Sequence, residues 1–366
     1  MKKIVAFFKG EMVLTIALIA ALLSMLFIAP DAAYASYVDW DVLMLLFSLM
    51  AVVAGLKKCG VMDRVSQMLL GRAGDARRLC LALSLACFFS SMLLTNDVAL
   101  LTFVPLTVAL LSAKPGALML TVALETVAAN LGSMATPIGN PQNLYLYAHY
   151  EMPIAQFFAA VLPLTAASLV LVVAASFLVK KDGLALPEQA EGRAIGGMIW
   201  LYAAQFLLCL ICVLGVLPKW VCFAAVLLST VAADRGLLRQ VDYALLFTFV
   251  CFFVFVGNLG RIEAVSAVLS RLIAGRELEM GIVCSQVISN VPAALMLSGF
   301  TQDAAELMRG VDLGGLGTLV ASLASLISFK LYLKAPGAKA GKYLGVFTAM
   351  NLAFLAVLYA LAKLGL

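Results

Sequence analysis

The chain has 366 residues, of which 64% are hydrophobic and 12% charged, with a formal net charge of +5 and a mean hydropathy of +1.06. Because a soluble protein is about a quarter charged, this composition excludes one or two water-soluble domains. Apolar runs near the length that a helix needs to cross about 30 Å of hydrocarbon recur from end to end. We therefore expect a polytopic membrane protein with little mass outside the bilayer.

The N-terminal segment combines basic residues with an apolar run, as a secretory leader does. Lysines precede the run at 12–29, and Ala33-Tyr34-Ala35 after it resembles a signal-peptidase site. Because the run is longer than the core of a usual leader, we expect a retained first helix, with cleavage as the alternative. In either case residue 36 lies outside the cell.

Apolar runs predict nine crossings of the membrane, two of them interrupted. They cover residues 12–29, 40–56, 117–147 (interrupted), 154–179, 197–217, 220–233, 243–259, 313–333 (interrupted) and 344–362. Most of the 25 Lys and Arg residues fall in segments on one side, which the positive-inside rule assigns to the cytoplasm. We therefore expect a multi-pass protein of the cell (inner or plasma) membrane, with the N-terminus in the cytoplasm and the C-terminus outside.

The apolar stretch 79–111 is too long for one crossing and too short for two, since a single helix would measure about 50 Å. Thr95-Asn96-Asp97 interrupts it near its midpoint, and Arg78 and Lys114 flank it. Both basic residues belong inside, so we expect a re-entrant hairpin whose tip lies deep in the membrane. Non-helical backbone at that depth is tolerated only against protein or water, so the tip indicates a site.

A second interruption lies in the crossing 117–147. The segment from Asn130 to Asn143 contains Pro137 and Pro141 together with glycines, and it cannot be continuous helix. Opened helix ends expose N–H and C=O groups near the midplane, which is how transporters build ion sites.

Both features recur in the second half of the chain. Ser289-Asn290-Val291-Pro292 matches the first tip, and residues 313–326 match 131–144 with Leu313 aligned on Leu131. The amphipathic stretches 56–70 and 259–272 also match. A continuous helix over 280–299 is the alternative to a second hairpin.

Since 40–56 and 243–259 run in opposite directions, the two halves are inverted, an arrangement typical of secondary transporters. We expect an all-α polytopic membrane protein with two inverted repeats, each with a re-entrant hairpin and a broken transmembrane helix. Its parts are an N-terminal helix and loop (1–39), a first repeat (40–180), a linker with connecting helices (181–242) and a second repeat (243–366).

Four segments carry a resemblance to a known family: LLTNDVALLTFVPL, NLGSMATPIGNPQN, SQVISNVPAALML and DLGGLGTLVASLASL. They resemble the signature segments of the ion transporter superfamily. This superfamily includes citrate-transporter-like permeases, arsenite permeases, NhaD-type sodium/proton antiporters and divalent-anion/sodium symporters. The likeness covers about residues 40–365, and it implies a homodimer in which a transport domain with two tips and two breaks moves against a static scaffold.

The resemblance implies that the tips and breaks line the transport site. We therefore expect substrate-binding residues at Thr95, Asn96, Thr136, Asn140, Asn143, Ser289, Asn290, Thr318 and Ser322. We expect the coupling Na⁺ or H⁺ at Asp97, Asn96, Asn130, Gly132, Asn290 and Gly314. No other metal and no cofactor is expected.

Asp97 departs from the dicarboxylate symporters, whose tips read Ser-Asn-Thr, and it resembles the antiporter and arsenite branches. Losing the tip threonines counts against a dicarboxylate substrate. An Asp at the bilayer centre costs about 2.5–3.5 kcal/mol, so we expect Asp97 to bind the coupling ion. Capping of the second hairpin arm is the alternative role. Glu125, in the middle of a helix, is a possible proton site or else a hydrogen-bonded packing partner.

We expect an ion-coupled secondary transporter of a small anion, such as a di- or tricarboxylate or an inorganic oxyanion, with an elevator-type motion. A Na⁺/H⁺ antiporter or an efflux permease for arsenite or another oxyanion is the alternative. The sequence has neither HExxH nor paired acidic clusters, so we expect no membrane protease or prenyl-transferring enzyme. One His and cysteines within apolar runs predict neither a zinc site nor a disulfide framework. Beyond solute, ion, lipid bilayer and a second subunit we expect no partner, and no nucleic acid.

Overall fold

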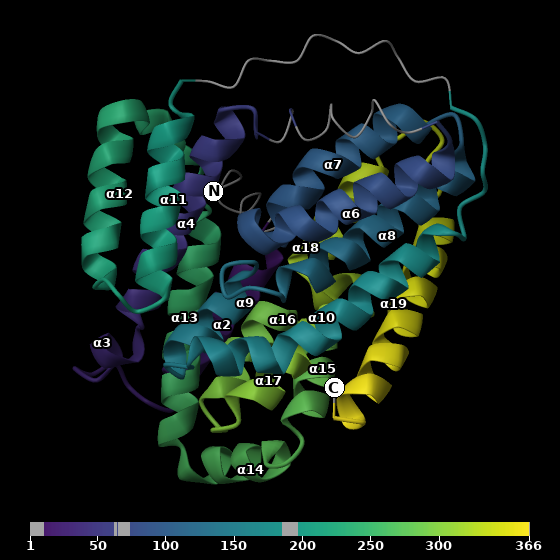
Figure 1. Cartoon of the computed structure of the whole chain (residues 1–366). Helices are drawn as coiled ribbons and strands as arrows, with labels where there is room; N and C mark the ends of the chain where they lie inside the picture. Colours follow the sequence, from purple (N-terminus) through teal and green to yellow (C-terminus); the bar gives the residue numbers. More distant parts are fainter. Residues whose placement is uncertain (1–10, 62–63, 65–73, 185–196, 366) are drawn as a thin grey trace, which may run out of the picture.

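The computed structural model describes residues 11–61, 64, 74–184 and 197–365 (Figure 1). Within these residues the only β-structure is an isolated bridge between Asp75 and Gly183, and seven helices are long and apolar enough to cross a membrane. Large apolar side chains face outward, with Leu26 80% and Trp200 81% exposed, which suits a lipid environment rather than water. The predicted all-α polytopic membrane protein is confirmed.

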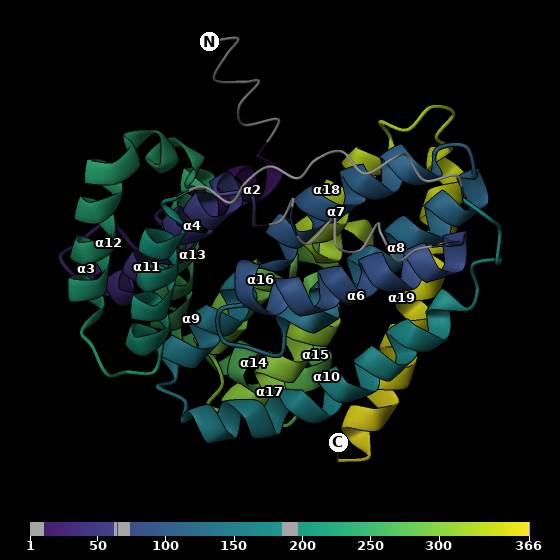
Figure 2. The same cartoon turned by 45° about the horizontal axis from the view of Figure 1, so that its top comes forward.

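One group of elements, which we call the scaffold lobe, lies on one side of the molecule, at left in Figures 1 and 2. It comprises α2 (Met12–Ser24), α3 (Tyr34–Tyr37), α4 (Trp40–Lys58), α11 (Ile199–Val213), α12 (Lys219–Asp234), η1 (Arg235–Gln240) and α13 (Tyr243–Arg261). Lys58, which ends α4, forms an ion pair with Asp234, shortly before α13 begins. Arg261, which ends α13, binds Asp31 at 2.7 Å, shortly before α4 begins. The two helices are therefore antiparallel.

The remaining helices form what we call the hairpin lobe. They are α6 (Ala76–Leu94), α7 (Asn96–Leu111), α8 (Pro115–Ser133), α9 (Pro141–His149), α10 (Ile154–Ser176), α15 (Glu277–Ile288), α16 (Asn290–Ser298), α17 (Ala304–Gly314), η2 (Leu319–Ala321), α18 (Leu323–Tyr332) and α19 (Ala340–Lys363). The amphipathic α14 (Glu263–Ile273) connects the two lobes. Its proposed counterpart at 56–70 lies largely outside the described residues.

Helices α6 and α7 form a hairpin that turns at Thr95. Its two ends meet the same segment after α10, because Ala76 N donates to Asp182 O and Lys114 Nζ donates to Gly183 O, both at 2.9 Å. The chain therefore returns to the side from which it enters, as predicted. The first arm, α6, begins directly after its Asp75 cap and not at residue 79, where the apolar stretch begins, and is therefore 19 residues long.

Helices α15 and α16 form a second hairpin, which turns at Ser289. Its ends are also close together: Thr301 Oγ1, beyond α16, donates to Glu277 Oε1 at the start of α15 at 2.9 Å. The alternative of one continuous helix over 280–299 is excluded.

Two membrane helices are broken in their middle. The first break separates α8 from α9 over residues 134–140, as predicted. The second broken helix begins at Ala304 and not near 313, which corrects the predicted boundary. Asp303, Glu306 and Arg309 make its first turns hydrophilic, but Leu307 is fully buried, so α17 is an amphipathic helix that an apolar-run criterion misses.

The two hairpins enter from opposite ends of α10. Just before α10, the Tyr150 hydroxyl donates to Ser298 O and Thr301 O at the base of the second hairpin, at 3.1 and 3.0 Å. Just after α10, Val179 O accepts from Arg77 Nε at 2.7 Å at the base of the first. This arrangement supports the inverted repeat, which stays a prediction together with its boundaries.

A close helix contact recurs in both halves. A Cβ on Gly132 of α8 would lie 2.1 Å from Phe88 O and 2.7 Å from Ser91 Oγ of α6, and a Cβ on Gly314 of α17 would lie 2.5 Å from Ser285 Oγ of α15. Only glycine permits such an approach. The two glycines correspond in the same register that the sequence match predicts.

Candidate functional site

Each hairpin turns at one strained residue. Thr95 has φ 73° and ψ 151°, and Ser289 has φ 75° and ψ 154°, a region that costs a residue other than glycine about 1–3 kcal/mol. The next residues, Asn96 and Asn290, each accept a hydrogen bond through Oδ1 from the following backbone N–H at 3.0 Å. The local bond at the start of α7 is therefore made by Asn96, and the carboxylate of Asp97 takes no part in it.

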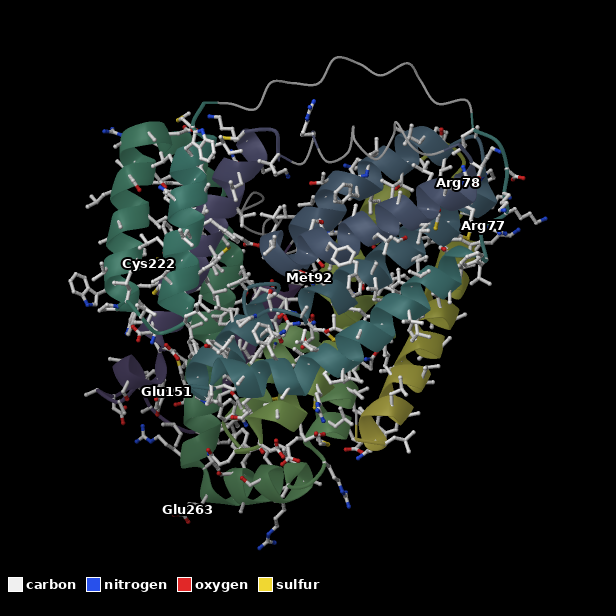
Figure 3. The ribbon with its side chains drawn as sticks, in the orientation of Figure 1. Arg77, Arg78, Met92, Glu151, Cys222 and Glu263 are labelled. Atoms are coloured by element: carbon white, nitrogen blue, oxygen red, sulfur yellow. The ribbon has the colours of Figure 1, made fainter. Side chains whose placement is uncertain are left out.

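The first tip lies in the interior of the molecule. Figure 3 places Met92, three residues before Thr95, near the centre of the view, with Arg77 at its right edge and Glu263 at its lower edge. Met92 O accepts a hydrogen bond from Thr136 Oγ1 in the first break. Thr136, predicted to contact substrate, thus ties the break to the hairpin.

Asn130 connects the first tip to the second break. Its Oδ1 accepts from Asn96 Nδ2 and from Ser322 Oγ, both at 3.1 Å. Its Nδ2 donates to Gly315 O at 3.4 Å and to Ser325 Oγ at 3.5 Å. Asn96 of α7 and Asn130 of α8, both predicted coupling-ion residues, therefore form one buried network with Ser322, a predicted substrate residue in the second break.

Gln286 of α15 holds the second break open. Its Nε2 donates to Gly314 O and Leu316 O, both at 2.9 Å, and its Oε1 accepts from Thr318 N at 2.9 Å. The Gly314 carbonyl, a predicted cation ligand, and the Thr318 backbone are thereby engaged with protein. Gln286 was not among the predicted residues.

A buried carboxylate lies between the two breaks. Asp312, at the end of α17, is 3% exposed. Its Oδ1 accepts from Asn140 Nδ2 at 3.2 Å and from Gln142 Nε2 at 3.3 Å, in the first turn of α9, and Asn143 also faces it. Asn143 Nδ2 donates to Met134 O at 3.2 Å.

Asp312 and Gln142 were not predicted. One signal was present in the sequence: the register that aligns Leu131 with Leu313 places Asp312 on Asn130. Asp312 comes directly before the matched stretch. It lies in α17, whose hydrophilic first turns kept this helix from being predicted as part of a membrane crossing.

A cavity of about 280 Å³ separates the two lobes beside the first tip. Thr95 and Asp97 line it from the hairpin lobe, and Asn140 lines it from the first break. The scaffold wall is formed by α4 and by the start of α13, where Lys57 and Asp242 contribute the charged groups. Most of the remaining lining is aliphatic.

The predicted site residues thus fall into separate groups. Thr95, Asp97 and Asn140 line the cavity, and Asn96, Asn130 and Ser322 form the buried network. Ser289, Asn290 and Thr318 of the second half are not in the cavity lining, and Gly132 serves close packing.

A second cavity, of about 430 Å³, lies at the other end of the boundary between the lobes. It is lined by the end of α9, the loop before α10 and the start of α12, including Glu151 and Lys219. None of the tip residues reaches it. The boundary between the lobes therefore contains a second cavity, which the tip residues do not line.

Glu125 lies away from these cavities, in the middle of α8 and fully buried. Its Oε1 accepts from Thr107 Oγ1 at 2.5 Å, and its Oε2 has no hydrogen-bond partner among the described residues. The packing role and the proton role both remain open on this geometry.

Among the described residues no group of three or more His, Cys, Asp or Glu side chains is arranged to hold a metal ion. All eight cysteines are free, and the thiols of Cys209 and Cys222 lie 3.7 Å apart between α11 and α12. Figure 3 places Cys222 within the scaffold lobe, away from the tips.

Comparison with known sequences places the chain among transporters. A family profile described as citrate transporter matches residues 4–327. An uncharacterised transporter of Methanocaldococcus jannaschii is 30% identical over 89% of this chain and 90% of its own length. The inner membrane protein YbiR of Escherichia coli is 30% identical over 83% of this chain and 84% of its own. A silicon efflux transporter of rice is 35% identical over 40% of this chain and 30% of its own length.

Proposed function

The chain belongs to the citrate transporter family, and from this premise we propose that it is an ion-coupled secondary active transporter of a small anion. One observation carries the proposal: the strained first tip presents Asp97 to a cavity at the boundary between two lobes. A carboxylate within the membrane costs free energy, so its presence in a lined cavity favours a functional role such as ion binding.

Asp97 and Asp242 line the same cavity, with Lys57 as its single cationic side chain among the described residues. A substrate anion in that cavity needs bound cations to offset the carboxylates. Entry of a dianion into a negative-inside cell also works against about 4.6 kcal/mol per 100 mV, which accompanying cations remove. We propose Na⁺ or H⁺ at Asp97 in this role.

The hydroxyl of Thr95 and the amide of Asn140 are the neutral polar groups that the predicted substrate residues contribute to the cavity. Asn140 also caps α9, whose N-terminal N–H groups attract negative charge. A small oxyanion or carboxylate group can accept from the Thr95 hydroxyl, whereas the Asn140 amide already donates to Ser133 and Asp312 and must release one of them to bind an anion. The absence of threonine after Asn96 and Asn290 counts against the dicarboxylate pattern.

We further propose that transport moves the hairpin lobe against the scaffold lobe. The cavity supports this because one wall belongs to each lobe. A homodimer, a cytoplasmic N-terminus and an outside C-terminus in the cell membrane stay predictions.

A second candidate is a Na⁺/H⁺ antiporter or an efflux permease for arsenite or another oxyanion. It is favoured by the negative character of the cavity, in which two carboxylates oppose one lysine. The relatives include proteins named silicon efflux transporter and putative transporter arsB.

Flux into proteoliposomes, with imposed Na⁺ and H⁺ gradients and a panel of carboxylates and oxyanions, tests the proposal. We expect gradient-driven uptake or exchange of at least one anion, absent from protein-free liposomes. Cation exchange without any solute flux would favour the antiporter. Flux that no ion gradient drives would contradict ion coupling.

A further inference from the structure

Asp312 has one satisfied and one unsatisfied carboxylate oxygen. Oδ1 accepts from two amides, whereas Oδ2 has no hydrogen-bond partner among the described residues. Asn143 Oδ1, on the neighbouring side chain, is a second buried acceptor without a donor. None of the ion pairs in the described part of the chain involves Asp312.

The Asp312 carboxylate is therefore buried without a partner, among the described residues, for one of its two oxygens. The amides and the N-terminus of α9 offset part of its charge, but an uncompensated charge in a low-dielectric interior costs several kcal/mol. Two buried oxygens that both lack a donor are satisfied either by a shared cation or by a proton on Asp312 that Asn143 Oδ1 accepts, and the experiment below separates the two. Carboxylate, amide and carbonyl oxygens are the ligands of hard cations.

The first half of the chain provides the comparison. Asn130 corresponds to Asp312, and its partners Ser322 and Ser325 correspond to Asn140 and Asn143. Both polar atoms of the neutral Asn130 side chain have partners. The same arrangement is therefore complete where the residue is Asn, and lacks a positive partner where it is Asp.

Asn140 joins this cluster to the cavity, since it lines the cavity and donates to Asp312. We propose that Asp312 and Asn143 form a sodium site between the two breaks, separate from Asp97 at the tip. Occupancy of this site fixes α17 against the start of α9. Its role in coupling, but not its existence, rests on the proposed function.

Na⁺ binding to the purified full chain tests the site. The midpoint of thermal unfolding is followed as NaCl replaces choline chloride at constant ionic strength. We expect a saturable rise for the wild type, and an apparent affinity at least tenfold weaker for Asp312→Asn. Glu277→Gln is the matched control: it also removes a buried carboxylate, one bonded to Thr301 outside the site, and we expect it to respond as the wild type does.

If Asp312→Asn does not fold, Asn143→Ala, which removes the second acceptor, is expected to weaken the response instead. A wild type without a Na⁺ response overturns the proposal, as does an Asp312→Asn protein that responds like the wild type. Na⁺ binding without any solute flux would refute the proposed function and leave the site standing. Solute flux by the wild type, together with an unchanged Na⁺ response in Asp312→Asn, would overturn the sodium site and leave the proposed function standing.

Discussion

Asp97 lies at the start of α7, where Asn96 already makes the local hydrogen bond of the turn. Its carboxylate lines the cavity between the lobes. We therefore predict that Asp97→Asn folds and inserts normally, with a melting temperature close to that of the wild type. Its transport should lose, or shift, its dependence on Na⁺ or pH, which flux assays at graded Na⁺ and pH will measure.

Asp242 offers the matched control for this prediction, because it contributes a carboxylate to the opposite wall of the same cavity. Asp242→Asn retains an oxygen to accept from Leu245 N and so to cap α13. We expect it to alter the rate of transport and to leave the ion dependence in place. An Asp97→Asn protein with unchanged Na⁺ and pH dependence would show that coupling resides elsewhere.

Glu125 is buried in α8, where it accepts from Thr107. Gln at this position can accept the same hydrogen bond, so we predict that Glu125→Gln keeps the pH dependence of flux. Thr107→Val, which removes the donor, should lower the free energy of unfolding by about 1–3 kcal/mol. Loss of the pH dependence in Glu125→Gln, with the fold intact, would instead assign the proton site to Glu125.

At the scale of elements, the contact of α8 with α6 and that of α17 with α15 each depend on one glycine. We predict that Gly132→Ala and Gly314→Ala lower the free energy of unfolding by about 1–3 kcal/mol each, because the added Cβ forces the helices apart. Gly116→Ala, in the first turn of α8, is the control, since a Cβ there meets nothing within 4 Å. Thermal unfolding in detergent measures all three; equal melting temperatures would contradict the close approach.

The first hairpin and the first break could be predicted from local sequence, because a polar triplet divides an apolar run too long for one span, and prolines cannot continue a helix. The second hairpin and the second break were predicted only from their match to the first, since 280–299 has the length of one span and 313–326 contains no proline. The first turns of α17 were missed because charged residues on one face lower the mean hydropathy of the segment, although the opposite face is apolar and buried. Amphipathicity there mattered more than mean hydropathy.

The contacts that assemble the site could not be predicted in the same way. Asn130 bonds residues of the other half of the chain, Ser322 among them, and Asp312 bonds Asn140. Such partners are set by how the two halves interlock, and no local pattern contains that information. The separation of the second tip from the cavity follows from the same packing.

For the whole molecule, the two hairpins are expected to enter from opposite sides of the membrane. Arg78 and Glu263 lie at opposite ends of the molecule (Figure 3), and both are exposed. We predict that a cysteine at 78 reacts with a membrane-impermeant thiol reagent only from the cytoplasm, and a cysteine at 263 only from outside. The wild type, whose cysteines are buried or half-buried, gives the background. Reaction of both cysteines from the same side would contradict the inverted arrangement of the two repeats.

The central claim is that the cavity beside the first tip opens alternately to the two sides of the membrane. Thr95 lines this cavity and is not fully buried. The most direct test is the rate at which a Thr95→Cys protein, reconstituted in known orientation, reacts with an impermeant thiol reagent applied to each side separately. We predict reaction from both sides, with the balance between them shifted by Na⁺ or pH and by transported solute. Reaction from one side alone, under every ion and solute condition, would contradict alternating access and with it the proposed transport cycle.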